Sequence, residues 1–198
     1  MPDALRAYVR GIDAMNRAIG RCAMYLLFAL IGVLLWSSVS KTFFTPTLWT
    51  LETAQFIMVG YYILGGPYAM QMGSNVRMDF FYGDWSPRRK AMADVITIWF
   101  LMFYLGVLLY GAISSTAYSL GYFGTEPFSF FADLARAFVT GGPAAASEVM
   151  GHMERSPSAW RPYVWPVKVV LCLGVALMIL QCTAEFFRDI ARLRGEEI

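Results

Sequence analysis

Charged residues are scarce in this chain. Only 15% of its 198 residues are Asp, Glu, Lys or Arg, whereas 58% are hydrophobic. A soluble globular domain carries about 25% charged and about 45–50% apolar residues. The shortage of charge therefore excludes an ordinary soluble domain and predicts that lipid is the solvent for much of the chain.

Histidine and cysteine are also scarce. His152 is the only histidine, and the three cysteines, Cys22, Cys172 and Cys182, form no CxxC pair. Haem in a helical bundle and dithiol chemistry both need such residues in pairs. The sequence also has no P-loop and no GxGxxG motif. We therefore expect no catalytic residue, no metal site and no cofactor in this chain, and we interpret His152 as a solvated loop residue.

The apolar residues are collected into long runs without charge. These runs cover residues 22–40, 53–76, 95–125 and 169–184. A transmembrane helix needs about 20 mostly apolar residues. The sequence therefore predicts an all-α integral membrane protein with transmembrane helices at 22–44, 50–72, 91–120 and 163–187. Lys168 is tolerated in the last of these because a lysine near a helix end can extend its ammonium group to the interface.

The basic residues are distributed unevenly among the connecting segments. Eleven of the 16 lie before the first predicted span, between the second and third, or after the fourth. Lys and Arg favour the cytoplasmic side of a membrane. We therefore expect both termini, the interfacial loop 73–90 and the tail 188–198 in the cytoplasm, with the loop 121–162 on the outer side.

Amphipathic patterns predict shorter helices outside the spans. In residues 1–21 apolar residues recur every three to four positions, and the arginines and Asp13 fall on the opposite helical face. This pattern predicts an interfacial helix whose charged face points to the lipid headgroups. In the outer loop we expect helices at 127–139 and 144–153, separated by Gly141-Gly142-Pro143. Gly65-Gly66-Pro67 within the second span predicts a kink or a close helix contact.

Two short motifs flank the loop between the second and third spans. They read Gly73-Ser74-Asn75-Val76-Arg77-Met78-Asp79 and Trp85-Ser86-Pro87-Arg88. Ser86-Pro87 predicts a helix start, with Ser as N-cap and Pro at the first helical position. With Glu52 at the start of the second span and Trp165-Pro166-Val167-Lys168 opening the fourth, the chain resembles the small permease subunit of tripartite ATP-independent periplasmic (TRAP) transporters, the DctQ-like family. The Trp-Pro-x-Lys segment is similar to the mannitol/chloroaromatic branch.

The resemblance implies a division of labour among three proteins. A periplasmic solute-binding protein would capture a small organic acid or related solute, and a large permease subunit would carry the sodium and substrate sites. The small subunit in the inner membrane would act as a scaffold and docking surface. Seven residues are candidates for contacts with the large subunit or with membrane phospholipids: Glu52, Arg77, Asp79, Arg88, Arg89, Trp165 and Lys168.

Other functions are compatible with the residues alone. A tetraspan assembly or sensor protein unrelated to transport has the same composition, and so has a membrane anchor for a redox enzyme whose cofactor ligands come from a partner. The arginines among the candidates have a simpler role as well, because positive-inside charge alone explains them. Glu52 and Lys41 are close enough in sequence to pair across the short outer loop.

Overall fold

In the computed structural model the chain is built of helices. The structure describes residues 3–73 and 85–194 and, for residues 87, 88 and 91, the backbone alone. The described part contains five helices and no strand beyond a single bridge: α1 (Asp3–Phe43), α2 (Thr50–Gln71), α4 (Pro87–Ser119), α5 (Pro127–Val149) and α6 (Trp165–Arg194). The predicted all-α class is confirmed.

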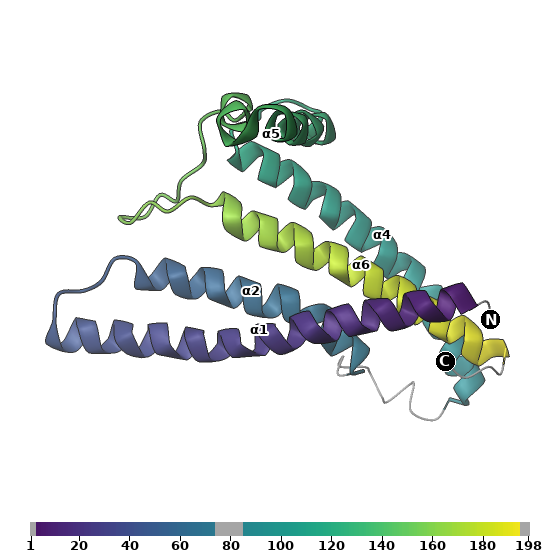
Figure 1. The fold of residues 1–198 in the computed structure, drawn as a ribbon. Coiled ribbons are helices and arrows are strands. Elements are labelled where there is room, and N and C mark those ends of the chain that lie inside the picture. The colour runs from purple at the N-terminus through teal and green to yellow at the C-terminus, as the bar shows by residue number, and fades with distance from the viewer. Residues whose placement is uncertain (1–2, 74–84, 195–198) are drawn as a thin grey trace.

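The four long helices pack as two antiparallel pairs (Figure 1). α1 packs against α2, and α4 packs against α6. α6 also contacts both α1 and α2 and so joins the two pairs. The start of α1 and the end of α6 lie close together at one end, while α5 lies across the opposite end of α4 (Figure 1). The start of α1 and the end of α6 mark the two ends of the described chain. We call the end with the termini the inner end and the end with α5 the outer end.

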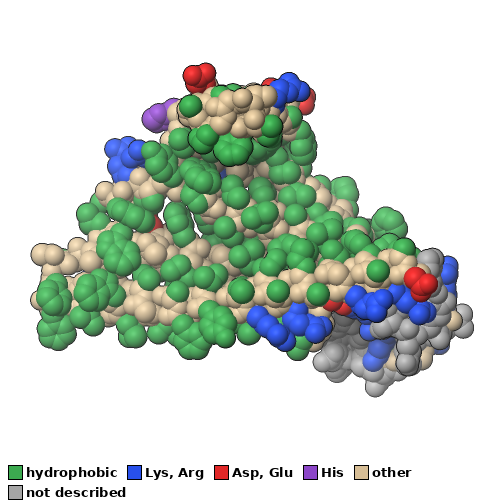
Figure 2. All heavy atoms as spheres, viewed as in Figure 1, with side chains coloured by type: hydrophobic (Ala, Val, Ile, Leu, Met, Phe, Trp, Pro, Cys, Tyr) green, Lys and Arg blue, Asp and Glu red, His purple; other side chains and the backbone are tan. Residues whose placement is uncertain are grey.

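Three of these helices are long and apolar enough to cross a membrane. They are α1, α4 and α6. Much of their apolar surface faces outward, since Phe28 of α1 and Phe103 of α4 are 69% and 74% exposed. Figure 2 shows hydrophobic side chains covering most of the visible surface, with charged groups gathered mainly at the two ends. Such continuous apolar exposure requires lipid or a protein partner as its neighbour.

α2 is not among those three helices. Its 22 residues include Glu52, two glutamines and three tyrosines, which lower its hydropathy, together with three glycines and Pro67. Small residues instead allow close packing. An added Cβ on Gly174 of α6 would stand 2.9 Å from the carbonyl oxygen of Ile63, and one on Gly66 would stand 2.7 Å from Met178 Cε. The close contact predicted for this glycine pair is therefore present at Gly66 and not at Gly65.

The first helix corrects one sequence-based boundary. We expected an interfacial helix at 1–21 followed by a span at 22–44, but α1 is one continuous helix from Asp3 to Phe43. At about 1.5 Å per residue it is about 60 Å long, twice the hydrocarbon thickness. No proline or capping signal interrupts residues 3–43. The N-terminal half of α1 contains the buried Val9 and packs against α6, for example through Tyr8 and Asn16.

The last helix is longer than predicted, again because of packing. α6 continues to Arg194 and not to residue 187, so most of the expected tail is helical. Ala191 is fully buried and Asp189 is 5% exposed with an ion pair to Arg192. Tertiary contacts of this kind extend helices beyond the point where hydropathy falls.

Other predicted boundaries agree with the structure. α4 starts at Pro87 after Ser86, whose extended backbone is that of an N-cap although its side chain makes no capping hydrogen bond. α5 contains two helical stretches divided at Gly142, which has φ 71° and thus a conformation that favours glycine. The second stretch ends at Val149, short of residue 153.

Candidate functional site

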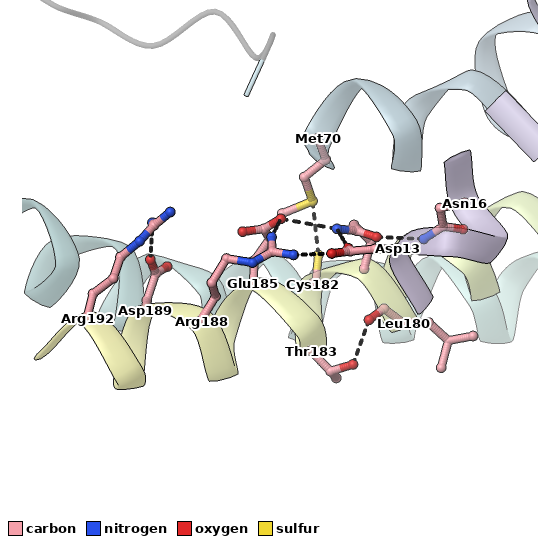
Figure 3. A network of polar contacts seen from close by, with 11 residues as sticks. Asp13, Asn16, Met70, Leu180, Cys182, Thr183, Glu185, Arg188, Asp189 and Arg192 are labelled. Carbon is pink, nitrogen blue, oxygen red and sulfur yellow. Dashed lines mark hydrogen bonds and ion pairs between the residues drawn. The ribbon is translucent and has the colours of Figure 1, made fainter. Parts of the chain in front are cut away.

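Two polar regions, one at each end of the helices, hold the apolar frame together. We call the first the inner network; it consists of Asp13 and Asn16 on α1 and of Gln181, Glu185 and Arg188 on α6 (Figure 3). Asp13 and Asn16 are about one helical turn apart, and Gln181, Glu185 and Arg188 follow one another at about one turn each. Each set therefore lies on one face of its helix.

Gln181 is the centre of the inner network. Its side chain is fully buried, and its Oε1 accepts a 2.7 Å hydrogen bond from Asn16 Nδ2. Its Nε2 donates to Asp13 Oδ1 at 3.2 Å and to Glu185 Oε1 at 3.1 Å. A buried amide that satisfies both its donor and its acceptor groups avoids the cost of an unpaired polar group. It also fixes the register of α1 against α6.

Arg188 balances the two carboxylates of the inner network. Its guanidinium forms ion pairs with Asp13 and with Glu185, and the three side chains are each 17% exposed. Charges this far from water are stable only when they are paired. Nearby, Tyr8 and Thr183 hydroxyls form a further 2.7 Å hydrogen bond between the same two helices.

Sequence analysis missed this network. We placed Asp13 with the arginines on the headgroup side of the N-terminal helix, and the structure corrects this, since Asp13 faces α6. The sequence did contain a signal for it. Asp13 and Asn16 are three positions apart, and Gln181, Glu185 and Arg188 follow one another at steps of four and three, so each set shares one helical face. Polar residues that recur on one face of an otherwise apolar helix indicate a contact with another polar helix face.

The second polar region, the outer contacts, joins the segment after α5 to three helices. At its α2 end, Glu52 is only 6% exposed and its Oε1 accepts a 2.5 Å hydrogen bond from Ser156 Oγ. Its Oε2 is buried without a hydrogen-bond partner among the described residues. The expected pairing of Glu52 with Lys41 is absent there; Lys41 lies exposed near the end of α1.

Lys168 anchors the other side of the outer contacts. Its Nζ lies 2.6 Å from Glu154 Oε2 and donates a 3.2 Å hydrogen bond to the carbonyl oxygen of Ser115 on α4. The backbone N–H of Glu154 also donates to the Ser119 carbonyl at 3.0 Å. The side chain of Lys168, expected at the interface, thus binds the loop and α4 together.

A chain of hydroxyl groups supports the outer ends of α1 and α2. Thr50 Oγ1 donates to Ser37 Oγ at 3.2 Å and lies 3.0 Å from Thr47 Oγ1, which in turn lies 3.3 Å from Ser40 Oγ. Ser37, Ser40 and Thr50 are buried. Hydroxyls that bond to one another in this way satisfy polar atoms at a helix junction without adding charge.

The remaining candidate residues differ in how far the structure describes them. Trp165 begins α6 and is 36% exposed, as suits a side chain at an interface. Arg89 is exposed in the first turn of α4. Arg77 and Asp79 lie outside the described residues, and so does the side chain of Arg88. The structure therefore brings Glu52 and Lys168 to the same outer segment and leaves the inner-loop candidates as predictions.

The described residues include no group of three or more His, Cys, Asp or Glu side chains placed to hold a metal ion. His152 is exposed in the outer loop. Among the cysteines only Cys182 is buried, with its Sγ 3.7 Å from Met70 Sδ, while Cys22 is exposed on α1. The arrangement can hold helices in a fixed relation to one another.

One comparison with known proteins assigns the chain to a family. The family model described as "Tripartite ATP-independent periplasmic transporters, DctQ component" matches residues 30–192. The chain belongs to this family. It is therefore the DctQ component, the small permease subunit, of a TRAP transporter, and its family is one of transporter components and not of enzymes. The match includes Glu52, Lys168, Gln181 and Arg188.

The comparisons do not resolve the mannitol/chloroaromatic branch of the DctQ family. No curated protein and no solved structure matches the chain significantly. The family match begins at residue 30, so Asp13 and Asn16 of the inner network precede it. TRAP systems combine a DctQ component with a large permease subunit and a solute-binding protein, which makes these two proteins the partners to consider.

Proposed function

We propose that this DctQ chain forms a fixed four-helix frame in the bacterial inner membrane. Beside this frame a sodium-coupled large permease subunit would import a small organic acid or a related solute delivered by a periplasmic binding protein. The frame would act as scaffold and docking surface and would not contain the solute site. The observation that carries the proposal is the pairing of charged groups inside the frame while large apolar faces stay open.

The first step concerns the number of spans. α2 packs along α1 and α6, and its 22 residues reach about 33 Å, enough for the hydrocarbon core of about 30 Å. From residue 53 to its end it carries no charge. A helix that is partly covered by protein needs less hydropathy than one surrounded by lipid. We therefore infer that α2 is the fourth span, beside α1, α4 and α6.

The second step concerns orientation. With four spans both termini lie on one side of the membrane, which is consistent with the proximity of the start of α1 to the end of α6 at the inner end (Figure 1). Eleven of 16 basic residues lie at positions 6–21, 77–90 and 188–194, which are the first half of α1, the α2–α4 connection with the first turn of α4, and the last turns of α6. The positive-inside rule then supports cytoplasmic termini and a periplasmic position for α5.

The third step concerns what the frame can do. Ionisable groups that carry ions or protons through a membrane face a path at mid-depth. In the described part of the chain, the buried carboxylates are Glu52 at the outer start of α2 and Asp189 near the inner end of α6, and the ion pairs of Arg188 and Lys168 also lie toward the two ends. This distribution favours a support role, with the transport chemistry in the large subunit.

The fourth step concerns the surfaces left for partners. Trp99, Phe100, Phe103 and Tyr104 on α4 are each at least 60% exposed. Their rigid aromatic surface suits packing against another membrane helix as well as lipid. On the periplasmic side, the segment from α5 through Ser156 is held by the outer contacts and offers a defined surface to the binding protein.

Co-purification and reconstitution test this function. The chain is expressed with a large permease subunit from a TRAP system and its binding protein, and liposome uptake is measured with an inward sodium gradient. We expect the two membrane subunits to purify together and uptake to require all three proteins. Sodium-driven accumulation by this chain alone would overturn the proposal, and so would its exclusive recovery with a signalling protein, which would favour the assembly or sensor function.

A further inference from the structure

A groove of about 360 Å³ opens between α1 and α2 toward the inner end. Its size falls in the range of about 300–1,000 Å³ that is typical of ligand pockets. The lining is mainly apolar and small, with three tyrosines. It consists of Gly20, Ala23, Met24, Tyr61, Tyr62, Gly65, Gly66, Tyr68, Ala69 and Met72.

Two glycines show where the groove is closed and where it is open. At Gly20 an added Cβ would overlap the side chain of Tyr68, so the two helices are in contact there. At Gly65 an added Cβ would meet nothing within 4 Å, so the space beside it is free. Tyr62 on the same helix is 67% exposed. The groove is therefore a side opening of the frame, accessible from the membrane.

Two arginines on α1 lie one helical turn from residues that line the groove. Arg17 and Arg21 are exposed on α1, one turn before Gly20 and Met24 respectively. Arg21 is the last charged residue before the charge-free run 22–40 and so stands at the edge of the hydrocarbon. Figure 2 shows basic side chains on α1 where the hydrophobic covering ends. Along α1 the apolar lining residues Ala23 and Met24 follow these two arginines on the side of the charge-free run.

We infer that this groove is a binding site for one anionic phospholipid of the inner leaflet. An acyl chain lies against Gly65 and the tyrosines, and the phosphate binds Arg17 and Arg21. Charge complementarity selects this occupant, because basic pockets at the cytoplasmic side of transmembrane helices bind anionic headgroups while an apolar slot accepts a chain. The site rests on the membrane orientation proposed above and does not require the proposed transport function.

Native mass spectrometry of the purified full-length chain tests the site, with phosphatidylglycerol and phosphatidylcholine as the added lipids. We expect wild-type protein to retain one phosphatidylglycerol in preference to phosphatidylcholine. Gly65→Leu places a side chain in the free space, where its Cβ meets no protein atom within 4 Å, and should abolish retention of both lipids. Gly32→Leu, on the exposed face of α1 where an added Cβ also meets nothing, is the matched control and should behave as wild type.

A charge variant tests the headgroup contact separately. Arg17→Gln with Arg21→Gln should weaken phosphatidylglycerol binding about thirtyfold, since each basic residue near an anionic lipid contributes about 1 kcal/mol. Arg10→Gln with Arg194→Gln removes the same charge at exposed inner positions away from the groove and should change binding less than threefold.

Three results would overturn this site. The first is equal retention of the two lipids by wild-type protein, and the second is unchanged lipid binding in Gly65→Leu. The third is a wild-type dimer that Gly65→Leu converts to a monomer, because a second copy of the chain would then occupy the groove. Assembly with the large subunit can be measured on the same variants. Normal assembly without lipid retention would reject the lipid site and leave the proposed function intact.

Discussion

Removing Arg188 gives the sharpest test of how α1 is held to α6. In Arg188→Met the long side chain keeps its packing, but Asp13 and Glu185 lose their shared cation while remaining 17% exposed. Breaking a buried ion pair by deleting one partner costs about 3–5 kcal/mol. Gln181 still donates one hydrogen bond to each carboxylate, so the lower figure of about 3 kcal/mol applies.

The expected loss is large enough to measure as a thermal shift. For a chain of this size about 1 kcal/mol corresponds to about 2–4 °C, so the unfolding midpoint should fall by about 6–12 °C. The assay is unfolding of detergent-solubilised protein at neutral pH, followed by tryptophan fluorescence. Arg10→Met is the matched control, because Arg10 is exposed and donates to the Arg6 carbonyl without an ion pair; its effect should stay below about 2 °C.

A compensating variant separates charge from packing. Asp13→Asn and Glu185→Gln added to Arg188→Met remove the two unpaired charges and keep groups that can accept from Gln181. This triple variant should recover more than half of the lost midpoint, since a neutral replacement of a buried ion pair is often tolerated. A midpoint for Arg188→Met within 1 °C of wild type would refute the reasoning that the inner network holds α1 to α6.

Two further predictions concern packing and the outer contacts. Gly174→Ala should lower the free energy of unfolding by about 1–3 kcal/mol, because the added Cβ would press on the Ile63 backbone. Gly106→Ala on α4, where an added Cβ meets nothing, should be neutral or slightly stabilising. Equal thermal midpoints for the two variants would contradict this prediction. Glu52→Ala should release the segment around Ser156, because it removes the hydrogen bond that Ser156 donates. Amide hydrogen exchange in this segment should then be at least about tenfold faster than in the control variant Lys41→Ala. Equal exchange in the two variants would show that Glu52 does not hold the loop.

Sequence patterns predicted much of the architecture because lipid imposes simple rules. Apolar length sets helix positions, so α2 and α4 lie within a few residues of their predicted bounds. Proline and glycine have strong local preferences, which explains why the α4 start at Pro87 and the division of α5 at Gly142 were predictable. The family motifs around residues 73–88 were sufficient to suggest the DctQ family that the family model then showed.

The polar contacts were only partly predictable. Glu52 and Lys168 were chosen as interface residues, yet the structure gives them partners within the chain, Ser156 and Glu154. No local pattern reveals such pairs, because the partners are 104 and 14 residues apart and meet only through the path of the outer loop. Gln181 shares a helical face with Glu185 and Arg188, which indicates a polar contact. The sequence does not tell which helix packs against that face.

By itself the sequence determined the solvent of this protein, the approximate limits of its apolar helices and the end that carries basic charge. These properties follow from local composition, since each hydrophobic run must leave water wherever it folds. The tertiary structure decided that α1 continues through residue 21, that α6 extends to Arg194, and that Asp13 meets Arg188. Those outcomes depend on which helix faces cover one another, and a buried charge is stable only where that packing supplies its partner.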